Sequence, residues 1–388
     1  MSRRFRSKRA KLALAMLAAV CCLLTAEFAL RLFGVGFPRP YIPDKHLGTR
    51  LQPGFESWFG KEGGACVAVN AMGFRDEDHE FQKEDGEFRI AVLGDSYVEA
   101  AQVPLEDTFW KLLESDLNSA HPKQRANVMG FGVSGFGTAQ ALLTFRHYAK
   151  SLKPDIVILA MTLTNDIRNN SKQLEPVRAR PFFELKNEQL VLDDSFLQHP
   201  SYVNAQRPRT QFKTDVVNSS RLLQLLTEFR NSASAKTETG PLEMGLDGTI
   251  YKVPETDEWR EAWIITEKLV LMLNEEVCAA GAQLIVMSVT DGMQVHPDPT
   301  VYTQFCEQLG VADLDYAEQR MAKFCQLNGI SMLALAKQMR SAATQEKLFL
   351  HGFANTEPGT GHWNVDGHRL AATLLRQFVV EQRAQIPE

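Results

Sequence analysis

The chain has 388 residues, 44% hydrophobic and 23% charged, a globular composition that excludes a collagen, a coiled coil or a wholly disordered chain. The net charge of −5 is unevenly spread, because residues 1–11 hold six basic side chains and no acidic one. Residues 35–388 hold 35 basic and 46 acidic side chains. Binding nucleic acid needs a clustered basic face, so this acidic body predicts no nucleic-acid partner.

The N-terminus combines this basic start with an apolar run from Leu12 to Ala26 and a second from Phe28 to Phe33. Such a pattern is typical of a signal peptide or of a membrane anchor. A cleavage site with Ala19 and Cys21 as its small residues would leave a very short apolar run, so an uncleaved transmembrane helix within residues 1–34 is favoured, with secretion after cleavage as the alternative. The positive charge before the helix predicts a single-pass protein of the cytoplasmic (inner) membrane, with its body on the outer or periplasmic side.

Four cysteines lie beyond this segment, far apart and without the spacing of a metal site. They are Cys66, Cys278, Cys306 and Cys325. One or two disulfides are permitted outside the cytoplasm, and four separate thiols are equally compatible with the sequence.

Residues 35–86 are rich in glycine, proline and aromatic residues and predict a loop-rich lead-in with a short strand near residues 67–70. From residue 87, short apolar runs alternate with segments of helical periodicity. The predicted strands are 88–93, 126–131, 155–160, 283–288 and 330–335, and the predicted helices are 108–118, 138–151, 257–280, 315–327 and 367–382. This alternation predicts an α/β domain over residues 87–388, a doubly wound, mainly parallel three-layer α/β/α sandwich of the flavodoxin-like type.

Residues 171–256 interrupt the alternation and are interpreted as an insertion that caps the sheet. Two apolar segments, 182–185 and 189–192, predict a hairpin, followed by a helix at 220–229 and a polar loop at 231–246. Phe182, Phe183 and, just beyond the insertion, Trp259 are candidate platforms for a sugar, although burial in the core is the alternative for each.

Polar and glycine-rich motifs follow the predicted strands at their carboxyl ends, where ligands bind in open α/β sheets. Ser96 follows the first strand in Gly94-Asp95-Ser96, where its hydroxyl points out of the sheet edge and its amide can donate to an oxyanion. Asp95 is a candidate substrate contact, with helix capping as the alternative. Gly135 lies in a glycine-rich turn after the second strand, and Asn165 follows the third, where its side-chain amide can also donate to an oxyanion.

Near the C-terminus, His362 stands in a glycine-rich loop before the last helix, a position from which a general base can reach the sheet edge. His368 is the alternative candidate for the general base. A metal held by both histidines is disfavoured, because no positioned carboxylate accompanies them.

These motifs, in this order, resemble the SGNH (GDSL-type) hydrolase superfamily over about residues 88–170 and 257–380. The resemblance implies Ser96 as nucleophile, His362 as base, and Gly135 and Asn165 as oxyanion donors beside the Ser96 amide. Together with the N-terminal apolar helix, the segment Asn70-Ala-Met-Gly-Phe-Arg75 and the sequence His362-Trp-Asn resemble the membrane-anchored bacterial branch, whose wider group acts on acyl or O-acetyl esters, some on cell-surface polysaccharides.

The sequence departs from the family at the third member of the triad. The family often carries Asp three residues before the catalytic histidine, where this chain has Gly359, and Leu163 replaces a usual glycine before Asn165. Asp291, after the fourth strand, or Glu357, in the histidine loop, are the candidate substitutes, with a Ser–His dyad as the other possibility.

The resemblance implies an esterase of the cell envelope that works through an acyl-enzyme, needs no metal or organic cofactor, and takes an ester-bearing small molecule or polysaccharide. Two alternatives stay open: an O-acyltransferase on an exported polysaccharide, and a catalytically silent glycan-binding or assembly protein on the same fold. The missing aspartate is the best support for the silent protein.

Overall fold

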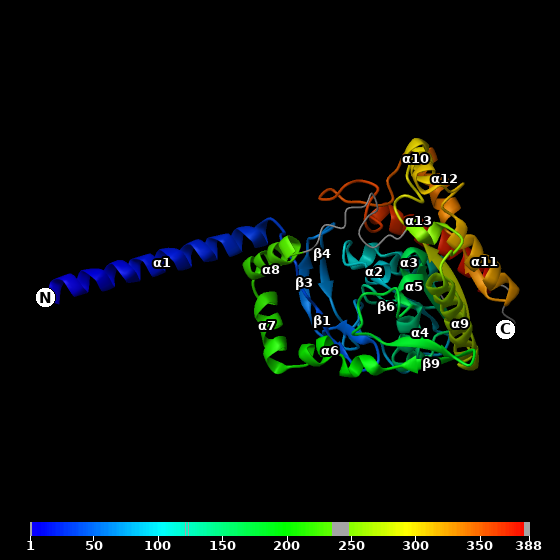
Figure 1. Ribbon diagram of the computed structural model, residues 1–388, viewed down its shortest axis with the longest axis horizontal. Helices are drawn as coiled ribbons and strands as arrows, with labels where there is room; N and C mark the ends of the chain where they lie inside the picture. The colour runs from blue at the N-terminus through cyan, green and yellow to red at the C-terminus, as the bar shows by residue number, and fades with distance from the viewer. Residues whose placement is uncertain (1, 121, 123, 235–247, 384–388) are drawn as a thin grey trace.

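The computed structural model describes residues 2–120, 122, 124–234 and 248–383. Its N-terminal helix α1 (Ser2–Leu32) extends away from the body (Figure 1). Within α1, Lys8–Leu32 is long and apolar enough to cross a membrane, and none of this stretch is buried by the rest of the chain. An apolar N-terminal helix is therefore confirmed.

The central sheet has five parallel strands. They are β5 (Phe88–Gly94), β6 (Ala126–Gly132), β7 (Ile156–Thr162), β10 (Gln283–Val289) and β11 (Ser331–Leu333). Their order across the sheet is β11-β10-β7-β5-β6. Counted along the chain, this is the 2-1-3-4-5 order of flavodoxin-like folds, which confirms the predicted architecture.

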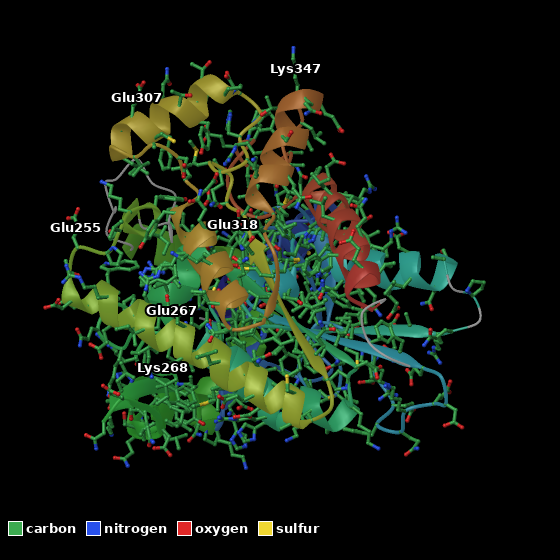
Figure 2. The ribbon with its side chains drawn as sticks, turned by 90° about the vertical axis from the view of Figure 1, so that its right-hand side faces the viewer. Glu255, Glu267, Lys268, Glu307, Glu318 and Lys347 are labelled. Carbon is green, nitrogen blue, oxygen red and sulfur yellow. The ribbon has the colours of Figure 1, made fainter. Side chains whose placement is uncertain are left out.

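Helices cover both faces of the sheet. One core lies under α4 (Thr138–His147), α9 (Asp257–Ala279) and α11 (Tyr316–Leu327), and the other under α3 (Phe109–Ala120), α12 (Ala336–Glu346) and α13 (Val365–Arg383). Figure 2 shows α9 running across its face of the molecule. Strand β5 serves both cores because successive side chains point to opposite faces: Ala91 and Leu93 enter one core, Ile90 and Val92 the other.

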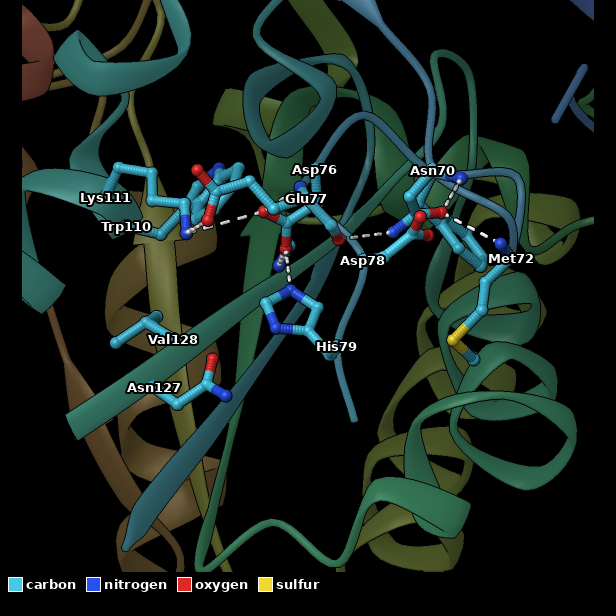
Figure 3. A network of polar contacts seen from close by, with 12 residues as sticks. Asn70, Met72, Asp76, Glu77, Asp78, His79, Trp110, Lys111, Asn127 and Val128 are labelled. Atoms are coloured by element: carbon cyan, nitrogen blue, oxygen red, sulfur yellow. Dashed lines mark hydrogen bonds and ion pairs between the residues drawn. The ribbon is translucent and has the colours of Figure 1, made fainter. Parts of the chain in front are cut away.

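Strand β6 forms one edge of the sheet, and carboxylates cover its outward amides. The backbone N–H of Val128 donates to Glu114 (2.7 Å), and that of Gly130 donates to Asp76 (2.9 Å). Asp76 also accepts from His79 at 2.7 Å and lies 3.6 Å from the Lys111 ammonium (Figure 3). These contacts block pairing of the edge with another strand and fasten the segment before β5 to the sheet.

The lead-in is more regular than predicted. It forms two antiparallel hairpins, β1 (Tyr41–Asp44) with β2 (Gly48–Leu51) and β3 (Glu56–Phe59) with β4 (Ala65–Ala68). The strand expected near residues 67–70 is β4, shifted toward the N-terminus. Four-residue strands leave too short an alternation to recognise in sequence, which explains why the other three were missed.

The insertion contains the predicted hairpin, β8 (Phe182–Lys186) with β9 (Gln189–Asp193). Three helices follow: α6 (Pro200–Ala205), α7 (Pro208–Asn218) and α8 (Arg221–Ser234). The prediction of a loop at 231–246 is wrong for residues 231–234, which belong to α8. The remainder of the predicted loop lies outside the described residues. Two short helices follow strands of the main sheet, α2 (Ser96–Glu99) and α5 (Leu163–Asn169), and α10 (Pro299–Leu309) follows β10.

The aromatic residues proposed as sugar platforms are buried instead. Phe182 and Phe183 are 2% and 3% exposed, and Trp259 is 7% exposed. Phe183 and Trp259 belong to the core under α4 and α9. The prediction of an exposed aromatic platform is therefore wrong, because the first strand of the hairpin turns its aromatic rings toward the protein.

The six cysteines are all free thiols in this structure. Cys66 and Cys278 are exposed, whereas Cys306 and Cys325 are buried. Burial raises the pKa of the Cys325 thiol to about 12.

Candidate active site

The predicted motifs meet at one edge of the sheet. Strand β5 pairs with β6 on one side and β7 on the other, all parallel, so their carboxyl ends lie side by side. Ser96 begins α2 directly after β5, Gly135 lies between β6 and α4, and Asn165 is in the first turn of α5 after β7.

The turn that presents Ser96 is fixed by Asp95. Asp95 is the N-cap of α2, where its carboxylate accepts from the backbone N–H of Tyr97 (3.0 Å). It is 3% exposed, and burial raises the pKa of its carboxyl. The predicted substrate contact is therefore wrong for Asp95, which caps the nucleophile's helix. Gly132 allows this helix to pack closely, since a Cβ there would lie 2.1 Å from the backbone nitrogen of Glu99.

His362 reaches the nucleophile. Its Nε2 lies 2.8 Å from Ser96 Oγ, within hydrogen-bond distance. The ring also lies against Tyr97, with the ring centroids 4.9 Å apart. The structure thus brings together the two residues that the sequence predicted as nucleophile and base.

The partner on the other side of the imidazole is Glu62, which the sequence did not reveal. Its Oε2 lies 2.7 Å from His362 Nδ1, and its Oε1 accepts from the backbone N–H of His362 at 2.6 Å. Burial opposes ionisation, but the hydrogen bonds and charge of His362 outweigh it and lower the pKa of the Glu62 carboxyl. An ionised Glu62 holds the proton of the neutral imidazole on Nδ1, which leaves Nε2 free to accept the Ser96 proton.

Glu62 belongs to the loop between β3 and β4, and the histidine loop clamps it. Asn355 accepts from the backbone N–H of Gly63 (2.9 Å) and donates to the carbonyl oxygens of Gly60 (3.3 Å) and Gly63 (2.9 Å). Gln102 adds a long contact to Glu62 Oε2, at 3.5 Å. The lead-in hairpin is therefore part of the site.

Asp291 does not contact His362, so the prediction that it orients the histidine is wrong. Its buried carboxylate accepts from the Tyr251 hydroxyl (2.7 Å) and from the backbone N–H groups of Met293 and Gln294. Burial raises the pKa of this carboxyl. Glu357, the other candidate, is exposed.

The backbone explains why no aspartate stands at the usual position. Gly359 has a φ of +83°, a conformation that side-chain-bearing residues rarely adopt, and its carbonyl packs against Gly292. A carboxylate has to reach His362 from another part of the chain, and the β3–β4 loop supplies it.

Gly135, the residue predicted to donate to an oxyanion, lies in an open turn. Its φ is +79°, and no heavy atom lies within 4 Å of where a Cβ would stand. The neighbouring Ser134 N–H already donates to Glu99 Oε2 (2.6 Å), and the Tyr41 hydroxyl donates to the same carboxylate (3.1 Å to Oε1). Glu99 is 2% exposed, and its buried carboxylate holds the turn in place through these contacts. Nothing in the sequence indicated this role.

A cavity of about 380 Å³ opens beside this turn. The lead-in, the β6–α4 turn and the insertion all contribute to its wall, which is mainly apolar; among the lining residues are Ile42, Pro43, Leu47, Gly135, Phe136 and Val177. The insertion therefore borders the Gly135 turn, while the residues lining this cavity include neither Ser96 nor His362.

His368 is remote from this chemistry. It is 1% exposed within α13, and its Nδ1 accepts from the backbone N–H of Phe109 (3.2 Å). Burial lowers its pKa to about 3, so the ring is neutral at physiological pH. Among the described residues, no group of three or more histidine, cysteine and acidic side chains is arranged to hold a metal ion.

No family model and no curated protein matches the chain. Solved structures similar to it include the acetyl xylan esterase AlAXEase, at 12% identity over 75% of this chain and 100% of that chain, with a TM-score of 0.40. Acetylxylan esterase Axe2 from Geobacillus stearothermophilus has 11% identity over 75% and 94%, with a TM-score of 0.40.

A GDSL-like lipase from Bacteroides thetaiotaomicron has 14% identity over 78% of this chain and 92% of its own, with a TM-score of 0.36. The sequence motifs of this chain resemble the same GDSL-type superfamily. At TM-scores of 0.36 and 0.40, these likenesses carry no conclusion about the activity of this chain.

Proposed function

We propose that the chain is a serine-dependent ester hydrolase that acts on acyl or O-acetyl esters through an acyl-enzyme. The observation that carries this proposal is the continuous chain of contacts from Ser96 Oγ through His362 to Glu62, with distances of 2.8 and 2.7 Å. Nucleophile, base and orienting acid in this arrangement are what acyl transfer requires.

In the proposed reaction, His362 Nε2 takes the proton of Ser96 as its oxygen attacks the ester carbonyl. The amides of Ser96 and Gly135 and the side chain of Asn165 hold the oxyanion. Collapse of this intermediate breaks the ester bond, and His362 gives its proton to the leaving alcohol. Water then attacks the acyl-enzyme with His362 again acting as base, which releases the acid and restores the serine.

The catalytically silent alternative depended on the missing aspartate, and Glu62 stands at hydrogen-bond distance from His362 in its place. Transfer to an acceptor hydroxyl would use the same acyl-enzyme as hydrolysis. Product analysis with and without an oligosaccharide acceptor separates the two reactions, since a transferase forms an acylated sugar at the expense of free acid.

We also propose that α1 is an uncleaved anchor and that the body lies on the outer side of the membrane. The last turns of α1 contact the body: Arg31 donates to the carbonyl oxygen of Ser219 (3.1 Å), and Glu27 accepts from the backbone N–H of Arg221 (3.0 Å). These contacts give the helix a structural role after export, which a discarded signal peptide would not need.

The test of the catalytic proposal is turnover of p-nitrophenyl acetate by the wild-type chain and by Ser96→Ala. We expect a burst of p-nitrophenol followed by steady turnover in the wild type, and neither in Ser96→Ala with an unchanged circular dichroism spectrum. Equal turnover by a purified Ser96→Ala protein would refute the assignment of the nucleophile.

A further inference from the structure

Helices α7 and α8 form a platform, residues 208–231, at the end of the body from which α1 emerges (Figure 1). Helix α7 runs across the direction of α1 in this view. The start of α8 is joined directly to α1, because Glu27 caps it. The Glu27 carboxylate accepts from the Ser220 hydroxyl (2.9 Å) and from the backbone N–H groups of Arg221 and Leu222 (both 3.0 Å).

This cap sets the level of the platform relative to the membrane. Glu27 and Arg31 form an ion pair at 2.8 Å in the last turns of the candidate span Lys8–Leu32. A charged pair is costly within hydrocarbon and belongs in the headgroup region. The first turn of α8 therefore lies at the surface of any bilayer that α1 crosses. This step rests on the proposed anchoring of the chain.

The platform exposes large apolar side chains close to this predicted membrane surface. Phe212 on α7 is 69% exposed, and Leu226 and Phe229 on α8 are 56% and 75% exposed. Single exposed apolar residues are ordinary in soluble proteins, but several on two consecutive helices beside a membrane span are typical of an interfacial surface.

The platform is also basic within an acidic body. Residues 208–231 hold four basic and two acidic side chains, whereas residues 35–388 as a whole have an excess of acid. A groove of about 600 Å³ runs along α7 and α8, and its described lining includes Arg39, Lys213 and Arg230 beside Leu223 and Leu226, with no acidic residue. Cations next to apolar side chains match the phosphate and upper acyl chain of an anionic lipid.

We propose that the α7–α8 platform lies on the bilayer surface, with its apolar side chains in the boundary between headgroups and acyl chains and its basic side chains against anionic lipid phosphates. The occupant is the bilayer that α1 crosses, since the platform is continuous with α1 through the Glu27 cap. The platform also contacts the loop of the proposed catalytic acid, because Glu228 on α8 pairs with Lys61 at 2.9 Å. Seating on the lipid would thus hold the active site at a fixed height above the membrane.

The experiment uses the full chain in lipid nanodiscs with a tryptophan introduced by Phe229→Trp. Lipids brominated near the headgroup end of the acyl chain quench tryptophan only on contact, and the unsubstituted chain supplies the background of the five native tryptophans. Leu327→Trp on α11 is the matched control, because Leu327 is 76% exposed against 75% for Phe229. Leu17→Trp, near the middle of the candidate span, is measured with lipids brominated near the far end of the acyl chain and reports whether α1 crosses the bilayer at all.

We expect brominated lipid to remove most of the fluorescence introduced by Phe229→Trp and Leu17→Trp and to leave that of Leu327→Trp unchanged. Quenching at position 17 without quenching at 229 overturns the platform and leaves the anchor standing. No quenching at position 17 overturns the anchor itself, and the esterase assay then still tests the active site separately.

The electrostatic part is tested by adding Lys213→Glu and Arg230→Glu to the Phe229→Trp chain. In nanodiscs that contain anionic lipid, the charge reversal is expected to reduce quenching at position 229. Equal quenching with and without the charge reversal overturns the role of anionic lipid.

Discussion

Replacing Glu62 by glutamine tests the least expected part of the site. In the wild type, the two carboxylate oxygens of Glu62 accept from two donors of one residue, the Nδ1–H and the backbone N–H of His362. A carboxamide has a single acceptor oxygen. The backbone N–H cannot change its role, so in Glu62→Gln the oxygen turns to it and the NH₂ group faces Nδ1. The imidazole then has to place its proton on Nε2, where it cannot accept the proton of Ser96.

The expected loss in kcat is on the order of 10⁴, the loss associated with a wrong histidine tautomer in Ser–His–Asp triads of other enzymes. A loss of 10⁴ corresponds to about 5 kcal/mol of transition-state stabilisation. The effect on KM is expected to be small, because Glu62 contacts the histidine and not the reacting ester.

The assay is steady-state hydrolysis of p-nitrophenyl acetate by Glu62→Gln beside Glu357→Gln. Glu357 is an exposed carboxylate in the histidine loop, so its substitution removes the same charge near the site without touching His362. We expect Glu357→Gln to retain wild-type turnover. A Glu62→Gln protein within tenfold of the wild type would refute the assignment of Glu62 as the orienting acid.

The other predictions concern the oxyanion region and stability. Asn165→Ala should lower kcat by about 10²–10³ with a small change in KM, measured in the same assay, and an unchanged kcat would remove Asn165 from the oxyanion site. Gly135→Ala should fold but lose about 1–2 kcal/mol in chemical denaturation, because its φ is +79° while the space around it is open. Gly132→Ala should not give a stable protein, because its Cβ would meet backbone at 2.1 Å, and a Tm equal to that of the wild type would contradict this packing. The folded-state pKa of Glu62 lies below its ordinary value of 4.5, so its ionised form contributes stability above about pH 4.5 that is lost as the pH falls. The Tm difference between the wild type and Glu62→Gln should therefore narrow as the pH falls below about 4.5, and a difference that grows on acidification would contradict the lowered pKa.

The sheet could be predicted from the sequence because its strands are buried on both faces. Residues 88–93 and 155–160 are short, almost continuous apolar runs, which are typical of buried parallel strands. Strands β5 and β7 begin within one residue of the predicted starts. The proposed nucleophile and base, Ser96 and His362, could also be identified from the sequence, because each lies in a compact motif at the boundary of a helix or strand.

Glu62, the proposed orienting acid, could not be predicted from the sequence, because its contact with His362 depends on tertiary structure alone. Glu62 and His362 are 300 positions apart, and nothing in the sequence around Glu62 marks it as functional. The only signal was negative: a glycine at position 359 where the family often has aspartate. That signal left open a carboxylate from elsewhere, with Asp291 or Glu357 as the candidates, or a Ser–His dyad, and it gave no indication of Glu62.

The prediction of an exposed aromatic platform was wrong for a different reason. A hairpin with two adjacent phenylalanines gives no indication of which face is covered, and here both rings of Phe182 and Phe183 are buried. Asp95 shows the same ambiguity, since an aspartate before a short helix suits both capping and substrate binding, and its contact with the Tyr97 amide identifies it as the cap.

The central claim is that Ser96 carries the acyl group during turnover, and mass spectrometry of the rapidly quenched enzyme tests it most directly. After mixing with p-nitrophenyl acetate, we expect a single acetyl group on the peptide that contains Ser96, present in the wild type and absent in Ser96→Ala. Turnover by the wild type with the acetyl group on another residue, or with no acyl-enzyme and no effect of Ser96→Ala, would contradict the proposed mechanism.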